Sequence, residues 1–125
     1  MTPTPTGFSA AARPFDGSVH VRFLDTMLAS TGDAAMIEDA DRGPLYLIPF
    51  DDVYFTYLTR TDASVDHPDR GRLGVWRVSA GGRAEDAVMW TLDEPPPGLA
   101  RFGRFVIFDG TKVTIEVVPA DGTVV

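Results

Sequence analysis

The sequence predicts a single, mainly β domain in which two antiparallel sheets pack together or close into a partly open barrel. Short apolar runs alternate with polar residues at a period of two, and Gly, Pro and Asp separate the runs. The runs are joined by turns rather than by long helices, which favours antiparallel pairing. The 125 residues suffice for one core, since domains have about 100–200 residues. We expect a flexible N-terminal arm (residues 1–16), a folded domain (17–119) and a C-terminal tail (120–125).

Eight strands are expected. The first, 18–23, is typical, because Val19, Val21 and Phe23 alternate with polar residues and so face one side of a sheet. The other seven follow the same reasoning or are dense in β-branched and aromatic side chains. They cover residues 27–29, 45–48, 53–58, 73–78, 87–92, 105–108 and 112–117.

One short helix is expected between the second and third strands. Ser30 or Thr31 can cap it, because a side-chain oxygen accepts hydrogen bonds from the free N–H groups of a first turn. Asp33 would lie at the positive end of the helix dipole. Gly43 followed by Pro44 would end the element. The pattern predicts a helix that continues to about residue 39.

Two connections are predicted from their turn residues. The polar segment 61–71 is expected to be a loop. Asp109-Gly110 lies between two apolar runs, and this dipeptide favours a type I′ turn, which needs positive φ at both central positions. We therefore expect strands 105–108 and 112–117 to form a β-hairpin.

The charge and hydropathy of the chain argue against two classes of partner, nucleic acids and membranes. Eleven Lys and Arg against 18 Asp and Glu give a net charge of −7, which repels phosphate backbones, so we expect no nucleic-acid partner. No apolar run approaches the about 20 residues that cross a bilayer, and the first residues lack the apolar core of a signal peptide. We expect no membrane partner and a cytoplasmic location.

Metal and cofactor chemistry find little support in the sequence. There is no cysteine, which excludes disulfides and thiolate metal sites. His20 and His67 are the only two histidines, and their spacing matches no pattern of metal ligands. There is also no glycine-rich phosphate loop. We expect neither a metal site nor a cofactor.

One turn, residues 66–71, gathers ionisable side chains. His67 can transfer protons near neutral pH, and a flanking aspartate could orient it. Arg70 or Arg72 could hold an anion, because a guanidinium stays charged and donates several hydrogen bonds. The alternative is a solvated turn in which Pro68 and the terminal glycine serve only the backbone.

Aromatic side chains on the expected strands offer a second group of candidates. Tyr46, Trp76 and Trp90 carry polar atoms that need partners when they are buried. Such residues either belong to the core or line a pocket between two sheets. The sequence leaves both alternatives open.

Paired carboxylates could hold Mg²⁺ against a nucleotide. Asp39 and Asp41 lie at the end of the expected helix, where carboxylates are usually solvated. Asp51 and Asp52 are adjacent, so on a strand they would point to opposite faces. Neither pair favours a metal–nucleotide site.

Four segments resemble the DUF427 family in order and spacing between about residues 18 and 118. They are Leu45–Val53, His67–Gly71 followed by Trp76, Met89-Trp90 with Glu94-Pro95, and Phe105–Phe108 with Val113. Four positions depart from the family pattern: His67 replaces Cys, Asp69 replaces Tyr, Arg70 replaces Lys and Phe50 replaces Arg.

The resemblance implies a β-tent-like fold, in which two antiparallel sheets pack at a steep angle around a ligand-sized cleft. The family also has a nucleotidyltransferase-type name. Our leading hypothesis is a module that binds a small, anionic ligand in this cleft. Tyr46, Trp76 and Trp90 would supply apolar contacts, and His67 with Arg70 would anchor the polar part.

Two other hypotheses remain. The first is an enzyme acting on a nucleotide, with Asp52 and His67 as candidate catalytic groups. The second is a structural or self-association domain without catalysis, whose exposed edge strands pair in a homodimer.

Overall fold

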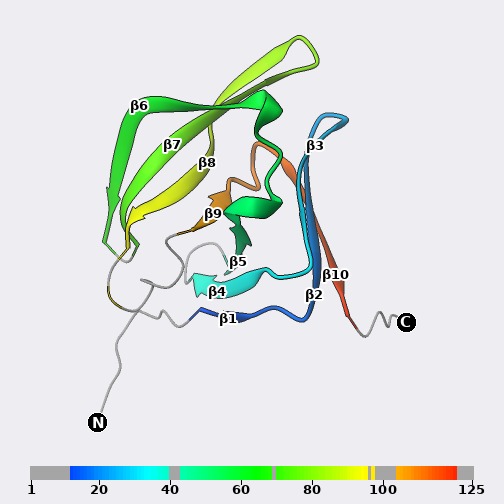
Figure 1. Cartoon of the computed structure of the whole chain (residues 1–125), viewed down its shortest axis with the longest axis vertical. Helices are drawn as coiled ribbons and strands as arrows, with labels where there is room; N and C mark the ends of the chain where they lie inside the picture. The colour runs from blue at the N-terminus through cyan, green and yellow to red at the C-terminus, as the bar shows by residue number, and fades with distance from the viewer. Residues whose placement is uncertain (1–11, 40–42, 69, 96, 98–103, 121–125) are drawn as a thin grey trace.

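The computed structural model describes residues 12–39, 43–68, 70–95, 97 and 104–120. Within them, the regular elements are ten β-strands and two short 3-10 helices (Figure 1). The strands are β1 (Arg13–Pro14), β2 (Gly17–Phe23), β3 (Thr26–Thr31), β4 (Ala35–Asp39), β5 (Gly43–Pro49), β6 (Leu58–His67), β7 (Gly71–Ala80), β8 (Arg83–Glu94), β9 (Phe105–Phe108) and β10 (Thr114–Pro119). The 3-10 helices are η1 (Phe50–Asp52) and η2 (Phe55–Tyr57).

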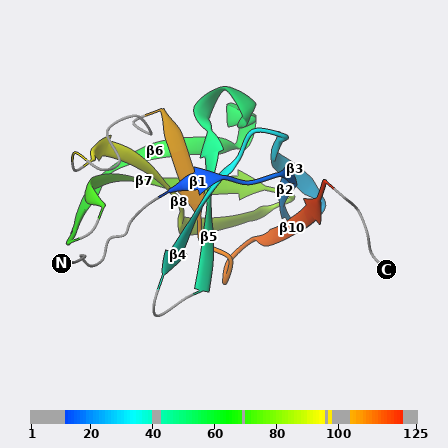
Figure 2. The ribbon, with the colours of Figure 1, turned by 90° about the horizontal axis from the view of Figure 1, so that it is seen from below.

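The strands form two antiparallel sheets, as the sequence predicts. The larger sheet has seven strands in the order β1-β4-β5-β9-β8-β7-β6, and the smaller has three in the order β10-β2-β3. Figure 2 shows that the larger sheet twists strongly, because β4 and β5 run across the direction of β6 and β7. Neighbouring strands of a sheet are each rotated by about 20–25°, and the rotations accumulate.

Each face of the larger sheet has its own apolar cluster. The smaller sheet covers one face, which we call the inner face, where Val21 and Leu28 pack with Met89. The second cluster includes Leu47 and Leu92 and lies on the opposite face, which we call the outer face. Strand alternation sends successive side chains to the two faces in turn, so one sheet serves both clusters.

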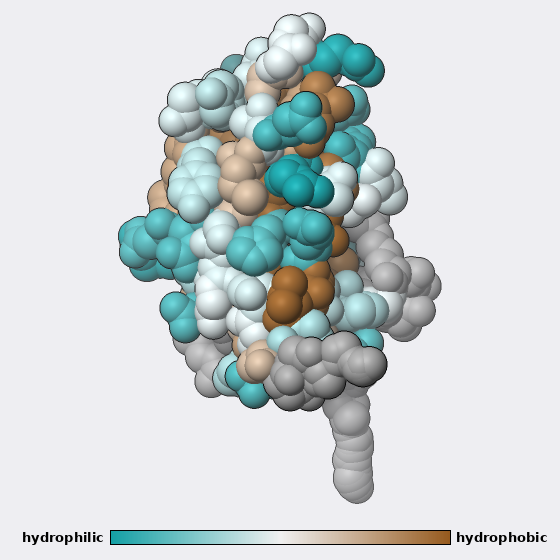
Figure 3. Space-filling view, turned by 90° about the vertical axis from the view of Figure 1, so that its right-hand side faces the viewer, coloured by the Kyte–Doolittle hydropathy of each residue, from teal (hydrophilic) through white to brown (hydrophobic). Residues whose placement is uncertain are grey.

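The exposed face of the smaller sheet is mainly hydrophilic, with separate apolar patches (Figure 3). Nδ1 of His20 lies 2.8 Å from the hydroxyl of Ser30. Arg22 forms a 3.5 Å ion pair with Glu116. One face of this sheet thus packs on the core and the other is solvated, as is common for antiparallel sheets.

The helix expected up to residue 39 is absent, and β3 and β4 occupy this segment. The expected cap, Thr31, instead accepts the N–H of Asp33 at 2.9 Å in the turn between these strands. Ala35 and Ile37 are buried, whereas Glu38 is exposed. Pairing of β4 with β5 on one side and β1 on the other outweighs the weak local preference for helix.

The predictions of a strand at residues 53–58 and of a loop at residues 61–71 were also wrong. Residues 53–57 belong to the connection from β5 to β6 and contact the smaller sheet: Val53 makes a single bridge to Ala29, and the N–H of Tyr54 donates to Leu28 O at 2.8 Å. The strand β6 begins at Leu58 and uses most of the expected loop. It is an edge strand exposed on both faces, so it lacks the apolar alternation that reveals a half-buried strand.

The expected hairpin at Asp109-Gly110 does not form. The strand β9 pairs with β5 and β8 in the larger sheet, whereas β10 pairs with β2 in the smaller sheet. A carboxylate oxygen of Asp109 accepts the N–H of Thr111 at 2.9 Å and its hydroxyl at 2.6 Å. The turn therefore carries the chain from one sheet to the other.

Part of the expected N-terminal arm belongs to the folded body. The strand β1 pairs with β4, and the N–H of Phe15 donates to Ala34 O at 2.8 Å. Residues 1–11 of the arm lie outside the described residues, as do residues 121–125 of the expected tail. No helix in the described part of the chain is long and apolar enough to span a membrane.

Candidate functional site

His67, Arg70 and Trp90 line one pocket on the outer face, which we call the basic pocket. Its volume is about 150 Å³. The other described residues of its wall are apolar and come from β5, β6, β7 and β9. These residues are Leu45, Val65, Leu73 and Ile107.

A tight turn between β6 and β7 brings Arg70 to the pocket. The N–H of Arg70 donates to His67 O at 3.3 Å. Gly71 follows with φ of +78°, and a Cβ there would lie 1.9 Å from the carbonyl oxygen of Glu94. A three-residue loop followed by a glycine of positive φ is a common hairpin connection. Gly71 thus lets the turn approach the end of β8.

The side chains of His67 and Arg70 are joined directly. Nη1 of Arg70 lies 2.6 Å from Nε2 of His67, and Arg70 is only 7% exposed. Since a guanidinium has donors and no acceptor, Nε2 of His67 accepts this hydrogen bond. The imidazole is therefore neutral, with its proton on Nδ1, and the positive charge remains on Arg70.

The indole of Trp90 contributes the aromatic part of the wall. It is half-buried and packs against the apolar cluster of the outer face. In the sheet it is paired with Val75 on one side and Ile107 on the other. A rigid indole beside a guanidinium can contact a flat or aliphatic ligand.

The apolar wall was not identified from sequence. Val65 and His67 are two residues apart on β6, so they share a face, and Val65 is paired with Leu73 on β7. The period-two spacing of Val65 and His67 is not recognisable in a segment that is interpreted as a loop. Asp66 points to the other face and pairs with Arg72 at 3.3 Å, so it does not orient His67.

Trp76 and Tyr46 do not reach the basic pocket. Both pack against the apolar cluster of the inner face. The Trp76 ring contacts Phe55 with centroids 5.3 Å apart. The Tyr46 ring meets Phe15 edge-on at 5.4 Å. The five expected ligand-binding residues are thus divided between the two faces of one sheet.

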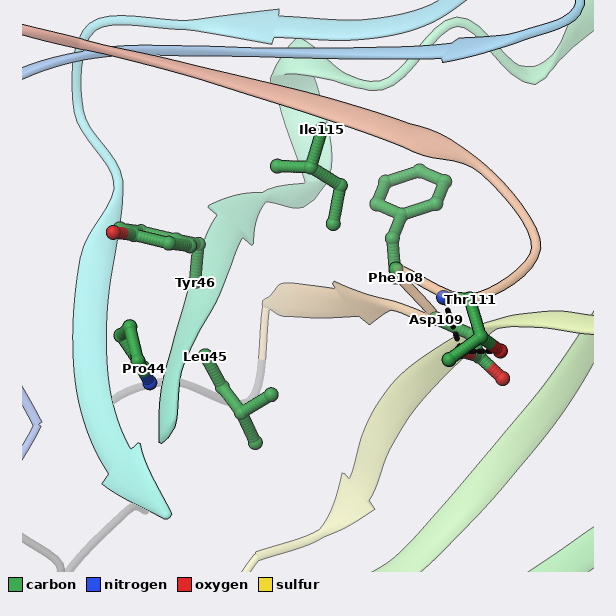
Figure 4. Close-up of a pocket in the computed structure, with 8 residues that line it drawn as sticks. Pro44, Leu45, Tyr46, Phe108, Asp109, Thr111 and Ile115 are labelled. Carbon is green, nitrogen blue, oxygen red and sulfur yellow. Dashed lines mark hydrogen bonds between the residues drawn. The ribbon is translucent and has the colours of Figure 1, made fainter. Parts of the chain in front are cut away.

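Tyr46 instead lines a larger pocket of about 440 Å³, which we call the inter-sheet pocket (Figure 4). Figure 4 shows Ile115 of β10 between Tyr46 and Phe108, with the Asp109–Thr111 turn at one side. Pro44, Leu45 and Gly110 complete the lining. This space, and not the basic pocket, lies between the two sheets.

Asp52 is engaged elsewhere. One of its carboxylate oxygens accepts the hydroxyl of Thr31 at 2.6 Å, and its neighbour Asp51 pairs with Arg104 at 3.5 Å. Asp39 ends β4, and Asp41 lies outside the described residues. Among the described residues, no three His, Asp or Glu side chains come together as a metal-binding group.

A polar network on the inner face was not expected from sequence. Arg60 forms an ion pair with Asp93, and the Thr91 hydroxyl donates to Asp93 at 2.9 Å. Trp76 Nε1 donates to the same hydroxyl at 3.3 Å. Gly74 makes room, because a Cβ there would lie 2.6 Å from Nη2 of Arg60.

The ion pair changes the acid–base properties of both partners. Burial on its own raises the pKa of Asp93, but hydrogen bonds from Arg60 and Thr91 outweigh it, so this pKa lies below its ordinary value. The hydrogen bond to Asp93 raises the pKa of Arg60. Both groups therefore stay charged at neutral pH.

Comparison with protein families gives a clear match. A family model described as a domain of unknown function, DUF427, matches residues 11–119. The chain belongs to the DUF427 family. The matched residues include all ten strands. The family model also carries the nucleotidyltransferase-type name expected from the sequence. We found no match among functionally curated proteins.

Two departures from the DUF427 pattern occur at the basic pocket. His67 and Arg70, two of the four positions expected from the resemblance to depart from the family, both line it. A third, Phe50, packs against Phe55 with ring centroids 4.6 Å apart and lies under the guanidinium of Arg104. The fourth, Asp69, lies outside the described residues.

Proposed function

We propose that this DUF427 domain binds a small anionic ligand in the basic pocket. The observation that carries the proposal is the guanidinium of Arg70, which is buried at the wall of an otherwise largely apolar cavity. A guanidinium keeps its charge at any physiological pH and presents hydrogen-bond donors in a plane that fits a carboxylate. His67 accepts from Arg70 and so helps to hold this plane in place.

The pocket restricts the size of the anionic group. Its volume of about 150 Å³ is below the about 300–1,000 Å³ of sites for drug-sized ligands. Its apolar wall and the Trp90 indole favour a carbon skeleton beside the charge. A carboxylate on a compact aliphatic or aromatic group meets both requirements.

The other two functions have less support. Nucleotidyl transfer by Asp52 and His67 would need both groups at one substrate, yet Asp52 accepts a hydrogen bond from Thr31 and does not line the basic pocket. Self-association through an edge strand is weakened at β6, where a register shift between Arg60 and Ser64 interrupts the ladder. Such irregular edges discourage pairing with another chain.

Calorimetry and amide NMR titrations with acetate, butanoate, benzoate and inorganic phosphate test the proposal. We expect butanoate or benzoate to bind and to shift the amide signals of the turn that precedes Gly71. Arg70→Gln should lose at least tenfold in affinity, because it removes the charge. Arg104→Gln is the matched control, since the Arg104 side chain is 77% exposed and lies outside the pocket.

Two results would overturn this function. One is that none of the four probes binds at millimolar concentration. The other is that Arg70→Gln, shown to be folded by its amide spectrum, binds as tightly as the unmodified protein. Arg70→Lys adds a graded test, since it keeps the charge but not the planar fork, and we expect it to bind with intermediate affinity.

A further inference from the structure

The larger sheet has an opening beside β5. The strand β9 pairs with β5 only at Leu47–Pro49, so Pro44–Tyr46 extend past the end of β9. After Phe108 the chain turns away toward the smaller sheet. Figure 4 shows Leu45 and Phe108 on opposite sides of this space. The inter-sheet pocket therefore occupies a place where no strand of the described residues closes the sheet.

The two pockets meet at Leu45. Its side chain lines the basic pocket on the outer face and also the inter-sheet pocket. Next to it, Tyr46 lines only the inter-sheet pocket, and Ile107 lines only the basic pocket. Among the described residues, Leu45 is thus the one that lines both cavities, and its side chain can change rotamer.

We propose that the ligand of this domain is an amphipathic anion that occupies both pockets. Its carboxylate binds at Arg70, and its apolar tail passes Leu45 into the inter-sheet pocket. This inference rests on the proposed function and names its ligand class: a medium-chain carboxylate, or a carboxylate with an equally long apolar group.

The lining of the inter-sheet pocket suits a tail rather than a head group. Pro44, Tyr46, Phe108 and Ile115 supply apolar surface on several sides. Among the described residues of the lining, Asp109 is the only acid, and its negative charge repels an anionic group. Arg70 attracts the carboxylate at one end, and Asp109 repels it at the other. The two charges therefore set the orientation of the ligand.

A series of straight-chain carboxylates from butanoate to decanoate, used below their micelle concentrations, tests the inference by calorimetry. Each buried methylene should lower the Kd about three- to fourfold until the inter-sheet pocket is full. Decanoate should also shift the amide signals of Asp109–Thr111, which butanoate should leave unchanged.

Ile115→Trp fills the inter-sheet pocket and should abolish the gain with chain length while butanoate still binds. Val118→Trp is the matched control, because Val118 lies on the same strand but is 48% exposed and lines neither pocket. Pro44→Trp is a second filling variant, placed at an exposed residue, for the case that Ile115→Trp does not fold.

The outcomes separate this inference from the proposed function. If butanoate binds through Arg70 but longer chains bind no more tightly, the inference is wrong and the proposed function stands. Equal gains with chain length in folded Ile115→Trp or Pro44→Trp would also overturn it. If Arg70→Gln binds every carboxylate like the unmodified protein, the proposed function itself fails.

Discussion

Nη1 of Arg70 lies 2.6 Å from Nε2 of His67, three residues earlier on the same turn. The arginine can only donate, so the histidine accepts with Nε2 and holds its own proton on Nδ1. This pair places a permanent positive charge and a neutral imidazole at the wall of one pocket. The position of the Arg70 charge and the tautomer of His67 therefore both depend on the conformation of the turn.

The tautomer of His67 is the first prediction. In long-range ¹H–¹⁵N spectra at neutral pH we expect a neutral ring with Nδ1 protonated and Nε2 free of a proton. Arg70→Gln removes the charged donor, and the ring should then approach the tautomer mixture of an exposed histidine. Protonation at Nε2 in the unmodified protein would contradict the hydrogen bond as described.

Gly71→Ala should destabilise the fold by about 2–4 kcal/mol. Its φ is +78°, and the new methyl group would meet Glu94 O at 1.9 Å. Gly82→Ala is the matched control, because Gly82 has φ of +77° but nothing within 4 Å of the new Cβ. We expect it to cost about 1 kcal/mol, from backbone strain alone. Urea unfolding measures both, and equal losses would show that the turn can move away from β8.

The low pKa of Asp93 predicts a pH dependence of stability. The folded state holds this proton less tightly than the unfolded state, so the stabilisation is complete above the ordinary pKa of the carboxyl group. It is lost as the pH falls through the lowered, folded-state pKa. Urea unfolding of Asp93→Asn should therefore show a smaller loss of stability on acidification than the unmodified protein.

A surface ion pair offers the control for that experiment. Arg77 and Asp86 pair at 3.0 Å, with the Asp86 side chain 81% exposed. Exposed pairs contribute about 0–1 kcal/mol, so Asp86→Asn should leave the pH profile close to that of the unmodified protein. A profile of Asp93→Asn that is no flatter than this control would contradict the role assigned to Asp93.

Gly110→Ala should change stability by no more than about 0.5 kcal/mol. The type I′ hairpin expected from sequence would need positive φ at this position, but Gly110 is not among the residues of positive φ in the described chain. A Cβ there would touch only Ile115 Cδ1, at an ordinary 3.6 Å. Thermal unfolding checks this prediction, and a loss above about 0.5 kcal/mol would contradict the conformation described for this turn.

Local patterns predicted the strands that pack on a core with one face. In β2 the alternation of Val19 and Val21 with His20 was sufficient, because burial on one side imposes a period of two. In β6 the same reasoning failed, since an edge strand with two exposed faces has no such period. The turn at Asp109 misled for another reason: the next strand found its partner in the other sheet.

The sequence by itself determined the antiparallel two-sheet class, the family and the presence of a basic turn at His67 and Arg70. Only the tertiary structure decided which aromatic side chains meet that turn. In the pairing of β7 with β8, Val75 is opposite Trp90, and Trp76 is opposite Met89. Since residues opposite each other share a face and successive residues alternate, this register sends the two indoles to opposite sides of the sheet. β7 and β8 are consecutive along the chain, but their register shifts between Trp76 and Val78, and the local sequence pattern does not reveal such an irregularity.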